Sequence, residues 1–412
     1  MNKIEFEDKD YLSKDKLIDL SDIDTIYMPL VVNFSTDVEI LVKKGKKIKK
    51  NDPIAIKKDL DFSIVSPVNG IINDISECVY LDGRTVKCVV IEKKGRQPKE
   101  EMVEDINAYT KEEYLELLKK YGVTSMGGGN FPTYIKYEPI LKTLIVNAVE
   151  CEPYITSDYV LAKEYFKEII ETINAIISIN KLRECFIAIN EKYSDLLSIY
   201  SNNTINYSKI HIVSVKDFYP IGWEKTLIKE ITKESYDKLP QEKGIVVNNI
   251  STIYSIYKAL KYNTCIDNRF VTISGERVKE PTNALLRIGT NLKDVLPNIE
   301  LIAGDTIKYV SGGPMMGRAL PKNDLIVTQN LNGILFLDDI EDKKVYPCFR
   351  CGKCVEMCPA NIVPVLIKDK VNNPEALKKL NPEKCIECGM CSFICPSNID
   401  VRSFVKKAKR SR

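Results

Sequence analysis

The chain has 412 residues, 44% of them hydrophobic, and a net charge of +3 at pH 7. This length predicts about three or four domains with well-filled cores, and the small net charge gives no reason to expect nucleic acid as a partner. No run of about twenty apolar residues occurs, because the best candidate, residues 169–179, is interrupted by Glu171, Thr172 and Asn174. We therefore expect no membrane-spanning helix.

The first part of the chain, from Ile26 to about Lys94, alternates short β-type stretches with turn residues. Within it, Asn69-Gly70 is the strongest short signal for a hairpin turn. The pattern predicts a small all-β module over residues 1–95, which resembles the barrel-sandwich fold of lipoyl and biotinyl carriers. No lysine stands at the turn tip to carry a prosthetic group, so we expect an unmodified module. The predicted strands are residues 39–42, 46–50, 53–56 and 70–75.

In the middle of the chain, predicted strands alternate with predicted helices, which indicates an α/β layer. We expect an α/β domain over residues 96–262, built from two successive units, and a β-rich domain over residues 263–340. The predicted strands of the α/β domain are residues 143–146, 185–189, 210–214 and 244–247, and its predicted helices are residues 110–121, 157–179, 222–233 and 251–262.

Two segments of the α/β domain are candidates for binding a ligand. Residues 126–133 contain three consecutive glycines, which let the backbone approach a phosphate or the edge of a flavin ring. Residues 147–153 follow a predicted strand, at the position where α/β sheets bind ligands, and they carry Glu150 and Glu152. A plain loop remains the alternative for the first segment, and a solvated loop for the second.

The last predicted domain, residues 341–412, contains two cysteine runs with the spacing C-x2-C-x2-C-x3-C-P. This spacing is typical of bacterial ferredoxins with two [4Fe–4S] clusters, in which the fourth cysteine of each run binds the other cluster. It predicts a small ferredoxin-like domain. One predicted ligand set is Cys348, Cys351, Cys354 and Cys395, and the other is Cys385, Cys388, Cys391 and Cys358.

Disulfides and structural zinc are the alternatives for these cysteines. Disulfides suit small secreted chains, whereas this chain is long and begins without a signal-peptide pattern. Zinc takes four ligands from two pairs, which leaves the third and fourth cysteines of each run unexplained. We favour iron–sulfur clusters, and we expect a cytoplasmic protein because such clusters are oxygen-sensitive.

Six segments occur in an order that resembles the RnfC family, the soluble flavin and iron–sulfur subunit of the Rnf ion-pumping complex. The chain is also similar to relatives that reduce cobalamin or act with proline reductase, and more distantly to the NADH-oxidising flavoprotein subunit of respiratory complex I. The segments are residues 127–133 (Gly-Gly-x-x-Phe-Pro-Thr), 147–154 (Asn-Ala-x-Glu-Cys-Glu-Pro-Tyr), 219–225 (Tyr-Pro-x-Gly-x-Glu-Lys), Asn248-Asn249, 312–317 (Gly-Gly-Pro-Met-Met-Gly) and the cysteine repeat.

The resemblance implies cofactors and the residues that bind them. It implies FMN in the α/β domain, NADH stacked over the flavin, and a β-grasp unit at residues 263–340. NADH is implied near Phe131, Glu152 and Glu224, and Gly222 belongs to the same cofactor-binding set. The residues implied for FMN are Gly127, Gly128, Gly129, Phe131, Thr133, Lys136, Asn147, Glu150, Asn248, Asn249 and Thr252.

The chain departs from the family pattern at several positions. Asn130 follows Gly129, Trp223 stands where glycine or an acidic residue is common, and the stretch at residues 233–240 is shortened. Asparagine tolerates positive φ, so the first change is compatible with the loop. For Trp223 three roles stay open: stacking on a ring, blocking the nicotinamide site, and packing in a core. These changes weaken the NADH assignment more than the FMN assignment.

We therefore predict an oxidoreductase that passes electrons from NADH through FMN and two [4Fe–4S] clusters to a partner protein. The flavin is needed because nicotinamide gives two electrons together and a cluster takes one; no side chain is required as a general acid or base. The partner is an Rnf-type membrane protein or a soluble reductase. The alternative is an electron-transfer adaptor without NADH, linking ferredoxin-like partners to a proline reductase or a cobalamin enzyme. The basic tail, residues 406–412, is compatible with peripheral membrane contact, although a solvated terminus explains it as well.

Overall fold

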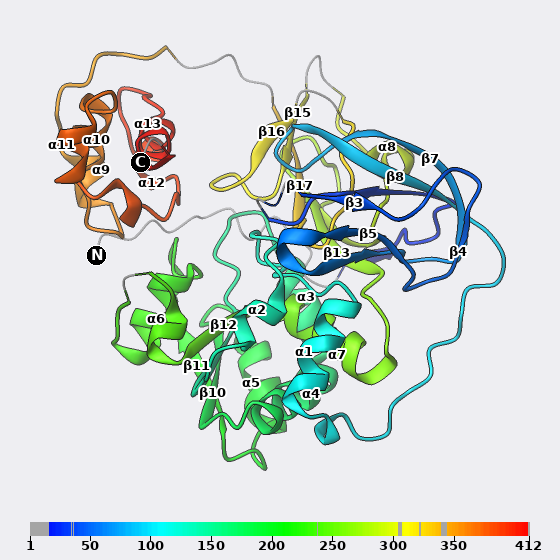
Figure 1. Cartoon of the computed structure of the whole chain (residues 1–412). Coiled ribbons are helices and arrows are strands. Elements are labelled where there is room, and N and C mark those ends of the chain that lie inside the picture. The colour runs from blue at the N-terminus through cyan, green and yellow to red at the C-terminus, as the bar shows by residue number, and fades with distance from the viewer. Residues whose placement is uncertain are drawn as a thin grey trace.

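The computed structural model describes residues 16–410 except 34, 36, 237, 304–306, 321–322 and 339–343. The ends of the predicted outer domains, the last two residues of the basic tail and part of the shortened stretch at 233–240 therefore lie outside the described residues. Figure 1 shows two β-rich units next to each other, an α/β unit against them, and a small helical unit at the C-terminus.

The N-terminal module consists of two antiparallel sheets around a shared core that includes Ile26, Ile54 and Ile72. Strand β2 (Thr25–Pro29) alternates half-buried and buried residues at its start, as expected for a sheet with one face on a core, whereas β8 (Thr85–Lys93) buries four consecutive residues, 88–91. One sheet has the order β2-β8-β7-β4, with β2 (Thr25–Pro29), β4 (Lys47–Ile48), β7 (Gly70–Val79) and β8 (Thr85–Lys93). The other has the order β3-β5-β6, with β3 (Glu39–Ile40), β5 (Pro53–Lys57) and β6 (Phe62–Val65).

The prediction of a hairpin at Asn69-Gly70 is wrong. Strand β6 pairs with β5, whereas β7 pairs with β4 and β8, so the turn connects the two sheets. Neither Asn69 nor Gly70 has the positive φ that a two-residue type I′ hairpin requires. Close packing requires glycine at position 70, because a Cβ there would lie 2.5 Å from the carbonyl oxygen of Glu92.

The second β-rich unit is built on a six-stranded mixed sheet with the order β1-β14-β13-β17-β15-β16. Strand β1 (Leu17–Asp19) comes from the N-terminal segment and pairs in parallel with β14, a contribution that the predicted division at residue 95 does not include. The two central strands β13 and β17 are parallel, and each has an antiparallel neighbour. The remaining elements are β13 (Asn268–Ser274), β14 (Thr282–Arg287), α8 (Leu292–Val295), β15 (Ile307–Ser311), β16 (Arg318–Leu320) and β17 (Gly333–Asp338).

The α/β domain contains one parallel sheet with the order β11-β10-β9-β12, so the two units expected from the sequence share a single sheet. Both faces are covered, which explains its apolar strands. Leu144 and Val146 of β9 pack in the large core with α3 (Ser157–Glu164), α4 (Phe166–Ile179) and α7 (Ile250–Tyr262), and Ile145 packs on the other face with Leu227 of α6 (Glu224–Thr232). The strands are β9 (Thr143–Ala148), β10 (Glu184–Asn190), β11 (Ile210–Val215) and β12 (Ile245–Asn249).

The helices of this domain follow the sequence pattern with three differences. The helix predicted over 157–179 is interrupted at Tyr165, and two helices, α2 (Thr133–Tyr137) and α5 (Ser194–Asn203), were not predicted. Helix α1 begins with a capping box between Thr110 and Glu113, which satisfies two backbone donors of the first turn. The other helices are α1 (Lys111–Lys120), α3 (Ser157–Glu164), α4 (Phe166–Ile179), α6 (Glu224–Thr232) and α7 (Ile250–Tyr262).

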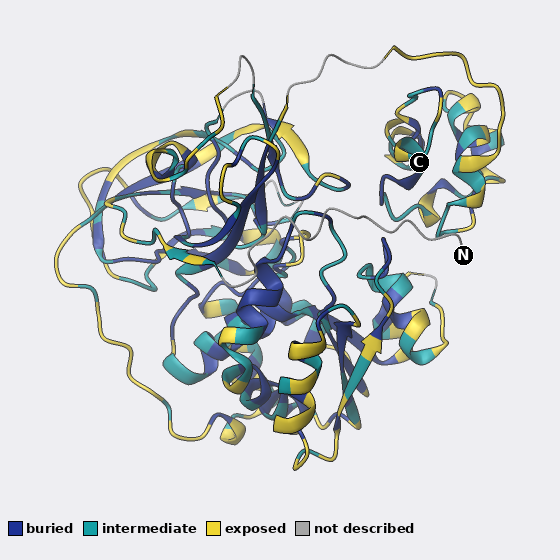
Figure 2. Ribbon diagram, turned by 180° about the vertical axis from the view of Figure 1, so that it is seen from behind, coloured by how far each residue is buried: buried dark blue, intermediate teal, exposed yellow. Residues whose placement is uncertain are grey.

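The C-terminal unit is small and carries the two cysteine runs. Figure 2 shows that its surface is mostly exposed or half-buried, in contrast to the deeply buried sheets. A modest apolar core of Ile367, Leu377 and Val405, with neighbouring residues, holds its short helices together. These helices are α9 (Lys353–Glu356), α10 (Pro364–Asp369), α11 (Pro374–Lys378), α12 (Met390–Phe393) and α13 (Val401–Arg410). Within the described ranges, no helix combines the length and apolar character needed to cross a bilayer.

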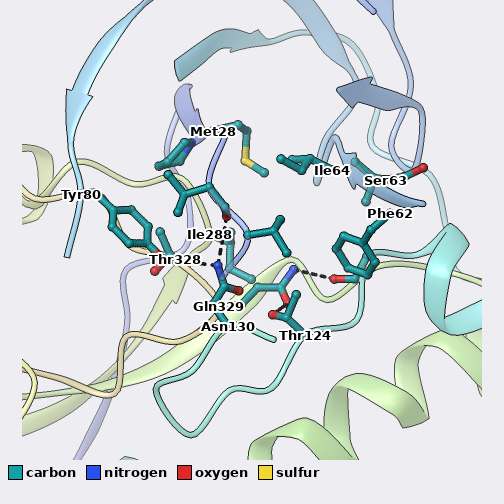
Figure 3. Close-up of a pocket in the computed structure, with 15 residues that line it drawn as sticks. Met28, Phe62, Ser63, Ile64, Tyr80, Thr124, Asn130, Ile288, Thr328 and Gln329 are labelled. Carbon is teal, nitrogen blue, oxygen red and sulfur yellow. Dashed lines mark hydrogen bonds between the residues drawn. The ribbon is translucent and has the colours of Figure 1, made fainter. Parts of the chain in front are cut away.

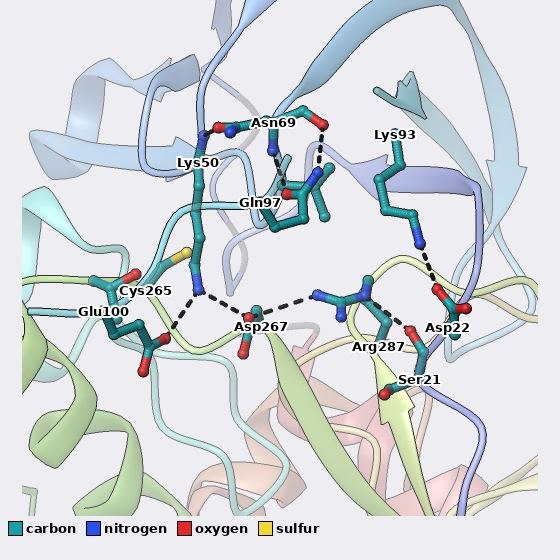
Figure 4. Close-up of polar contacts among 12 residues, drawn as sticks. Ser21, Asp22, Lys50, Asn69, Lys93, Gln97, Glu100, Cys265, Asp267 and Arg287 are labelled. Carbon is teal, nitrogen blue, oxygen red and sulfur yellow. Dashed lines mark hydrogen bonds and ion pairs between the residues drawn. The ribbon is translucent and has the colours of Figure 1, made fainter. Parts of the chain in front are cut away.

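Polar contacts join the N-terminal module, the α/β domain and the second β-rich unit to one another. Around the cavity in Figure 3, Asn130 Nδ2 donates to the carbonyl oxygen of Val31 at 3.0 Å, and Gln329 Nε2 donates to that of Gly122 at 3.1 Å. In Figure 4, Lys50 Nζ lies 2.8 Å from Asp267 Oδ2. The Lys50 side chain is only 6% exposed, and Glu100 Oε1 lies 3.1 Å from the same Nζ, so two carboxylates compensate this buried charge.

Candidate functional site

The carboxyl ends of β9 and β12 form the crevice of the α/β domain. From β9 the chain adds β10 and then β11 on one side, and β12 is added on the other side of β9. Such a switch point is where open α/β sheets bind ligands. Asn147 and Asn249 are register partners at this edge, so two of the predicted flavin contacts lie on neighbouring strand ends.

The glycine-rich loop lies directly at this edge. A Cβ on Gly127 would lie 3.2 Å from Asn249 Cβ, and the backbone N–H of Met126 donates to Thr252 Oγ1 at 2.9 Å. By contrast, a Cβ on Gly128 or Gly129 would meet none of the described atoms within 4 Å. Residues 127–129 are exposed, so one side of the loop is anchored to α7 and the other presents backbone to a ligand.

The crevice also contains polar groups that a ligand can satisfy. Within the described residues, Asn248 Oδ1 and Thr133 Oγ1 are buried without a hydrogen-bond partner. Buried polar atoms normally have partners, so these two atoms point to a polar ligand. Lys136 Nζ donates to the carbonyl oxygen of Val247 at 2.6 Å and lies 4.0 Å from Glu224 Oε2. Burial lowers the pKa of Lys136, and the Glu224 carboxylate opposes that shift. Open glycine backbone, unpaired polar atoms and a lysine together fit FMN.

The two carboxylates after β9 have other partners. Glu150 accepts hydrogen bonds from the backbone N–H groups of Asp158 and Tyr159 at 3.0 and 2.9 Å, so it caps the N-terminus of α3. Glu152 Oε2 accepts from the backbone N–H of Met315 at 3.1 Å. Asn147 Nδ2 donates to the carbonyl oxygen of Gly222 at 2.7 Å, which brings these two predicted residues together.

A buried ion pair behind the crevice was missed by the sequence reasoning. Asp158 accepts hydrogen bonds from Asn249 Nδ2 at 2.5 Å and from Ser251 Oγ at 2.6 Å, and it lies 3.6 Å from Arg269. Arg269 is 1% exposed although it is a large cation. Asp158 therefore orients the predicted flavin contact Asn249. No local sequence signal marks this pair, because its members are far apart in the chain.

The two cysteine sets surround two separate cavities in the C-terminal unit. One is lined by Cys348, Cys351, Cys354 and Cys395, and the other by Cys358, Cys385, Cys388 and Cys391. The structure thus brings the last cysteine of each run to the first three of the other. Nowhere in the described chain do three Cys, His, Asp or Glu side chains converge as they do on a single metal ion. A cavity lined by four cysteines fits an iron–sulfur cluster.

The electrostatics of the second cavity agree with this. Burial raises the pKa of the Cys388 and Cys391 thiols to about 12. Thiolates at these positions therefore require a compensating positive charge, which iron ions supply on binding.

The second cysteine run is packed against the other units. Tyr219 OH, from the α/β domain, donates to the carbonyl oxygen of Cys388 at 2.6 Å. Arg402 Nη1 donates to the carbonyl oxygen of Met315 at 2.9 Å. Tyr219, Met315, Cys388 and Met390 form a buried apolar cluster with Trp223 at its side. Trp223 therefore lies at the domain junction.

The residues around Met315 explain a glycine-rich segment of the sequence. Glu152 and Arg402, from two different units, bind the backbone of Met315 on its two sides. A Cβ on Gly313 would lie 2.4 Å from Glu152 Oε2. The segment 312–317 is thus a close-fitting contact between three units.

The cavity in Figure 3 is a separate feature. It is lined by none of the predicted flavin contacts and lies between the N-terminal module and residues 122–130.

The chain is similar to known proteins over most of its length. The RnfC-type subunit of the proton-translocating ferredoxin:NAD(+) oxidoreductase complex of Clostridium ljungdahlii is 30% identical over 378 residues, which cover 88% of this chain and 82% of that protein. The chain belongs to the RnfC family. Another relative, the corresponding subunit of the ion-translocating oxidoreductase complex of Rhodobacter capsulatus, is 30% identical over 364 residues, covering 84% of this chain and 70% of that protein.

Domain families match the same regions of this RnfC-family chain. The RnfC barrel sandwich hybrid domain matches residues 4–96, the Nuo51 FMN-binding domain matches 118–258, and the 4Fe-4S dicluster domain matches 347–399. These matches confirm the predicted barrel-sandwich, flavin and iron–sulfur domains.

A solved structure has the same fold. The chain aligns with an NAD+-reducing [NiFe]-hydrogenase in the H2-reduced state with a TM-score of 0.51 and 15% identity. The alignment covers 74% of this chain and 61% of that one, less than two thirds. At this identity the likeness concerns the fold alone.

Proposed function

We propose that this chain is the flavin and iron–sulfur electron-transfer subunit of an Rnf-type complex, and that it takes electrons from NADH. The observation that carries the proposal is the coexistence of two sites in one chain. An open glycine loop with unpaired polar atoms lies at the switch point of the sheet, and two cavities walled by four cysteines each lie in the adjoining unit. The name of the Clostridium relative, a subunit of a ferredoxin:NAD(+) oxidoreductase complex, supports a nicotinamide as the redox partner of the flavin, although that name gives NAD+ as the electron acceptor.

The residues of the crevice would hold FMN through polar contacts. The loop 127–129 presents backbone, Asn248 Oδ1 and Thr133 Oγ1 offer unpaired polar atoms, and Lys136 supplies a half-buried amino group. The two cysteine sets would ligate two [4Fe–4S] clusters. When bound, FMN accepts two electrons together and releases them singly, which matches a two-electron donor to one-electron clusters. The residues of the chain itself would bind these groups and orient them.

The six-stranded sheet supports the proposed β-grasp assignment. Its central strands β13 and β17 are parallel, their outer neighbours are antiparallel, and α8 lies between β14 and β15 in the chain. We propose that this unit serves as a spacer, because its segment 312–317 contacts both the flavin domain and the cluster unit.

A second candidate function is an electron-transfer adaptor that does not use NADH. Two carboxylates implied for NADH already have protein partners: Glu152 accepts from the backbone of Met315, and Glu224 accepts from Tyr236 OH at 2.8 Å. These contacts favour the adaptor, because NADH would have to replace them.

The test is reconstitution of the chain with iron, sulfide and FMN under anaerobic conditions, followed by NADH. Bleaching of the flavin absorbance supports the dehydrogenase, and a flavin that binds but stays oxidised leaves only the adaptor. FMN affinity is measured in parallel by fluorescence. Asn248→Ala should weaken FMN binding about tenfold, the value of one lost hydrogen bond of about 1.4 kcal/mol.

Asn190→Ala is the matched control for this substitution. Asn190 is also a buried amide at the carboxyl end of the sheet, but it lies on β10 and donates to Asp217 at 2.6 Å. Its replacement should leave FMN binding unchanged. Equal losses in both variants, with folding verified by circular dichroism, would argue against the proposed FMN site.

A further inference from the structure

The glycine loop of the α/β domain is closed at its base by its own backbone. The N–H of Ser125 donates to the carbonyl oxygen of Phe131 at 2.8 Å, and the N–H of Asn130 donates to the carbonyl oxygen of Ser125 at 3.1 Å. These bonds fix the base of the loop. The tip, residues 127–129, consists of glycines and has no side chains of its own to fix its backbone.

A side chain of the second β-rich unit reaches this tip. Asn330 Nδ2, from the segment between β16 and β17, donates to the carbonyl oxygen of Gly128 at 3.1 Å, although the two residues are 202 positions apart in the chain. Thr328 Oγ1 donates to Asn330 Oδ1 at 2.9 Å. This second bond determines which end of the Asn330 amide faces the loop, because a hydroxyl donates to the amide oxygen and leaves the NH2 group for the carbonyl.

The bond to Gly128 also determines the direction of the next N–H group. Among the described residues only the Tyr219–Pro220 peptide bond is cis, so the bond between Gly128 and Gly129 is trans. In a trans peptide the carbonyl oxygen and the following N–H point in opposite directions. Because the Gly128 carbonyl is turned toward Asn330, the Gly129 N–H points away from it.

This N–H group is available to a ligand. Across the described part of the chain, no protein acceptor receives a hydrogen bond from the Gly129 N–H. A Cβ on Gly128 or Gly129 would meet none of the described atoms within 4 Å, so the space around both residues is open. With glycine on both sides, this peptide could rotate freely. The contact with Asn330 therefore selects one of its orientations.

A second anchor comes from the N-terminal module. Asn130, at the base of the loop, has a φ of 46° and donates to the carbonyl oxygen of Val31 and to Tyr80 OH at 3.3 Å (Figure 3). Burial raises the pKa of Tyr80, and hydrogen bonds with Asn330 and Asn130 oppose that rise. The two asparagines thus share one buried hydroxyl, which links the anchors of the loop to each other.

We propose that Asn330 and Asn130 are positioning residues of the flavin site, which hold the loop so that the Gly129 N–H stays directed at an acceptor atom of FMN. The inference rests on the proposed function, because it concerns the same loop. The acceptor is a phosphate oxygen or an atom at the edge of the flavin ring, since both accept a hydrogen bond from a backbone N–H. FMN binding thereby depends on two units outside the α/β domain.

The test measures the affinity of the full chain for FMN by fluorescence under anaerobic conditions. Asn330→Ala should weaken FMN binding about tenfold, because it frees the Gly128–Gly129 peptide to rotate. Thr328→Val keeps the side-chain shape but removes the hydroxyl that orients Asn330, and should weaken binding about threefold. Thr328→Ser should restore the affinity. A role of Thr328 in packing alone would not give this rescue, because serine lacks the methyl group that valine retains.

Two further variants test how the anchors act. The double variant Thr328→Val/Asn330→Ala should bind FMN as well as Asn330→Ala alone, because Thr328 acts through Asn330. Asn130→Gly retains access to positive φ but loses the bonds to Val31 and Tyr80, and should weaken FMN binding about threefold.

Asn69→Ala is the matched control. Asn69 Nδ2 donates to the carbonyl oxygen of Arg96 at 2.8 Å, and its Oδ1 accepts from the N–H of Lys50 at 2.9 Å, so all these contacts lie within the N-terminal module. Its replacement should change the affinity for FMN less than about twofold, even where it lowers stability. Thermal unfolding of each FMN-free variant, followed by circular dichroism, separates loss of folding from loss of binding.

Riboflavin, which lacks the phosphate, distinguishes the two acceptors. Equal losses of FMN and riboflavin affinity in Asn330→Ala would assign the Gly129 N–H to the ring, and a loss for FMN alone would assign it to the phosphate. Unchanged FMN affinity in Asn330→Ala and Asn130→Gly, or an equal loss in Asn69→Ala, would overturn the inference and leave the flavin site standing. No FMN binding by the unmodified chain would instead refute the flavin part of the proposed function, and the inference with it.

Discussion

Residues 351–353 and 388–390 occupy equivalent places in the two cysteine runs, yet the first three are exposed and the second three are buried. A Cβ on Gly352 would meet none of the described atoms within 4 Å, whereas a Cβ on Gly389 would lie 2.9 Å from the carbonyl oxygen of Met315. The motif fixes how cysteines are arranged around a cluster. The contacts made by its outer side decide whether the run is buried against neighbouring units or exposed to solvent.

The largest expected effect comes from removing one cysteine of each run. Cys351→Ser and Cys388→Ser should each lower the iron content from about eight to about four atoms per chain. Only Cys388→Ser should prevent NADH from reducing the remaining cluster, because the Cys388 set packs against the α/β domain through Tyr219 and we expect it to lie nearer the flavin. Iron analysis and low-temperature electron paramagnetic resonance measure both effects. Equal reduction of the remaining cluster in the two variants would contradict the order.

Loss of the clusters to a chelator should also be unequal. With an iron chelator in mild oxidant, the exposed cysteine set should release its iron first, so that about half of the iron is lost before the rest. Alkylation followed by mass spectrometry should label Cys348 and Cys351 before Cys388. Simultaneous labelling of both sets would show that burial does not distinguish them.

Alanine substitution of Gly352 and Gly389 tests the contact between the second cysteine run and Met315 directly. Gly352→Ala should cost about 1–2 kcal/mol, the strain of positive φ in a residue with a side chain. Gly389→Ala carries the same strain and also forces Cβ against Met315, which should add about 1–3 kcal/mol. Anaerobic thermal unfolding followed by circular dichroism compares the variants, and Gly352→Ala is the control. Identical unfolding temperatures of the two variants would mean that position 389 does not pack closely against Met315.

The smallest effect concerns one hydrogen bond at the junction. Tyr219→Phe removes the donor to the Cys388 carbonyl and should destabilise the junction by about 1 kcal/mol. This corresponds to about fivefold faster amide exchange around residues 385–391. Tyr346→Phe, on the exposed run, serves as the control and should leave this exchange unchanged. Unaltered amide exchange in Tyr219→Phe would mean that this hydrogen bond does not stabilise the junction.

Much of the fold followed from the sequence. Apolar runs bounded by turn residues predicted the four strands of the α/β sheet, because a parallel sheet buried on both faces has nearly continuous apolar strands. The prediction of a hairpin at Asn69-Gly70 was wrong because the same dipeptide also suits a turn between two sheets. Whether a hairpin or such a turn forms depends on which strands pair with β6 and β7. Helix α5 was not predicted because its residues 194–203 are mostly polar or exposed, and only Leu196 and Tyr200 are buried.

The candidate site divides in the same way. The sequence by itself determined the spacing of the eight cysteines and the short motifs around the crevice, because cysteine spacing and glycine turns depend on local geometry. Only the tertiary structure brought Asn147, Gly127 and Asn249 together at one edge of the α/β sheet. It also placed the Glu150 carboxylate at the N-terminus of α3, which it caps. It alone also distinguished the two cysteine runs. Burial depends on residues distant in the chain, here Tyr219 and Met315, and the spacing of a motif carries no information about them.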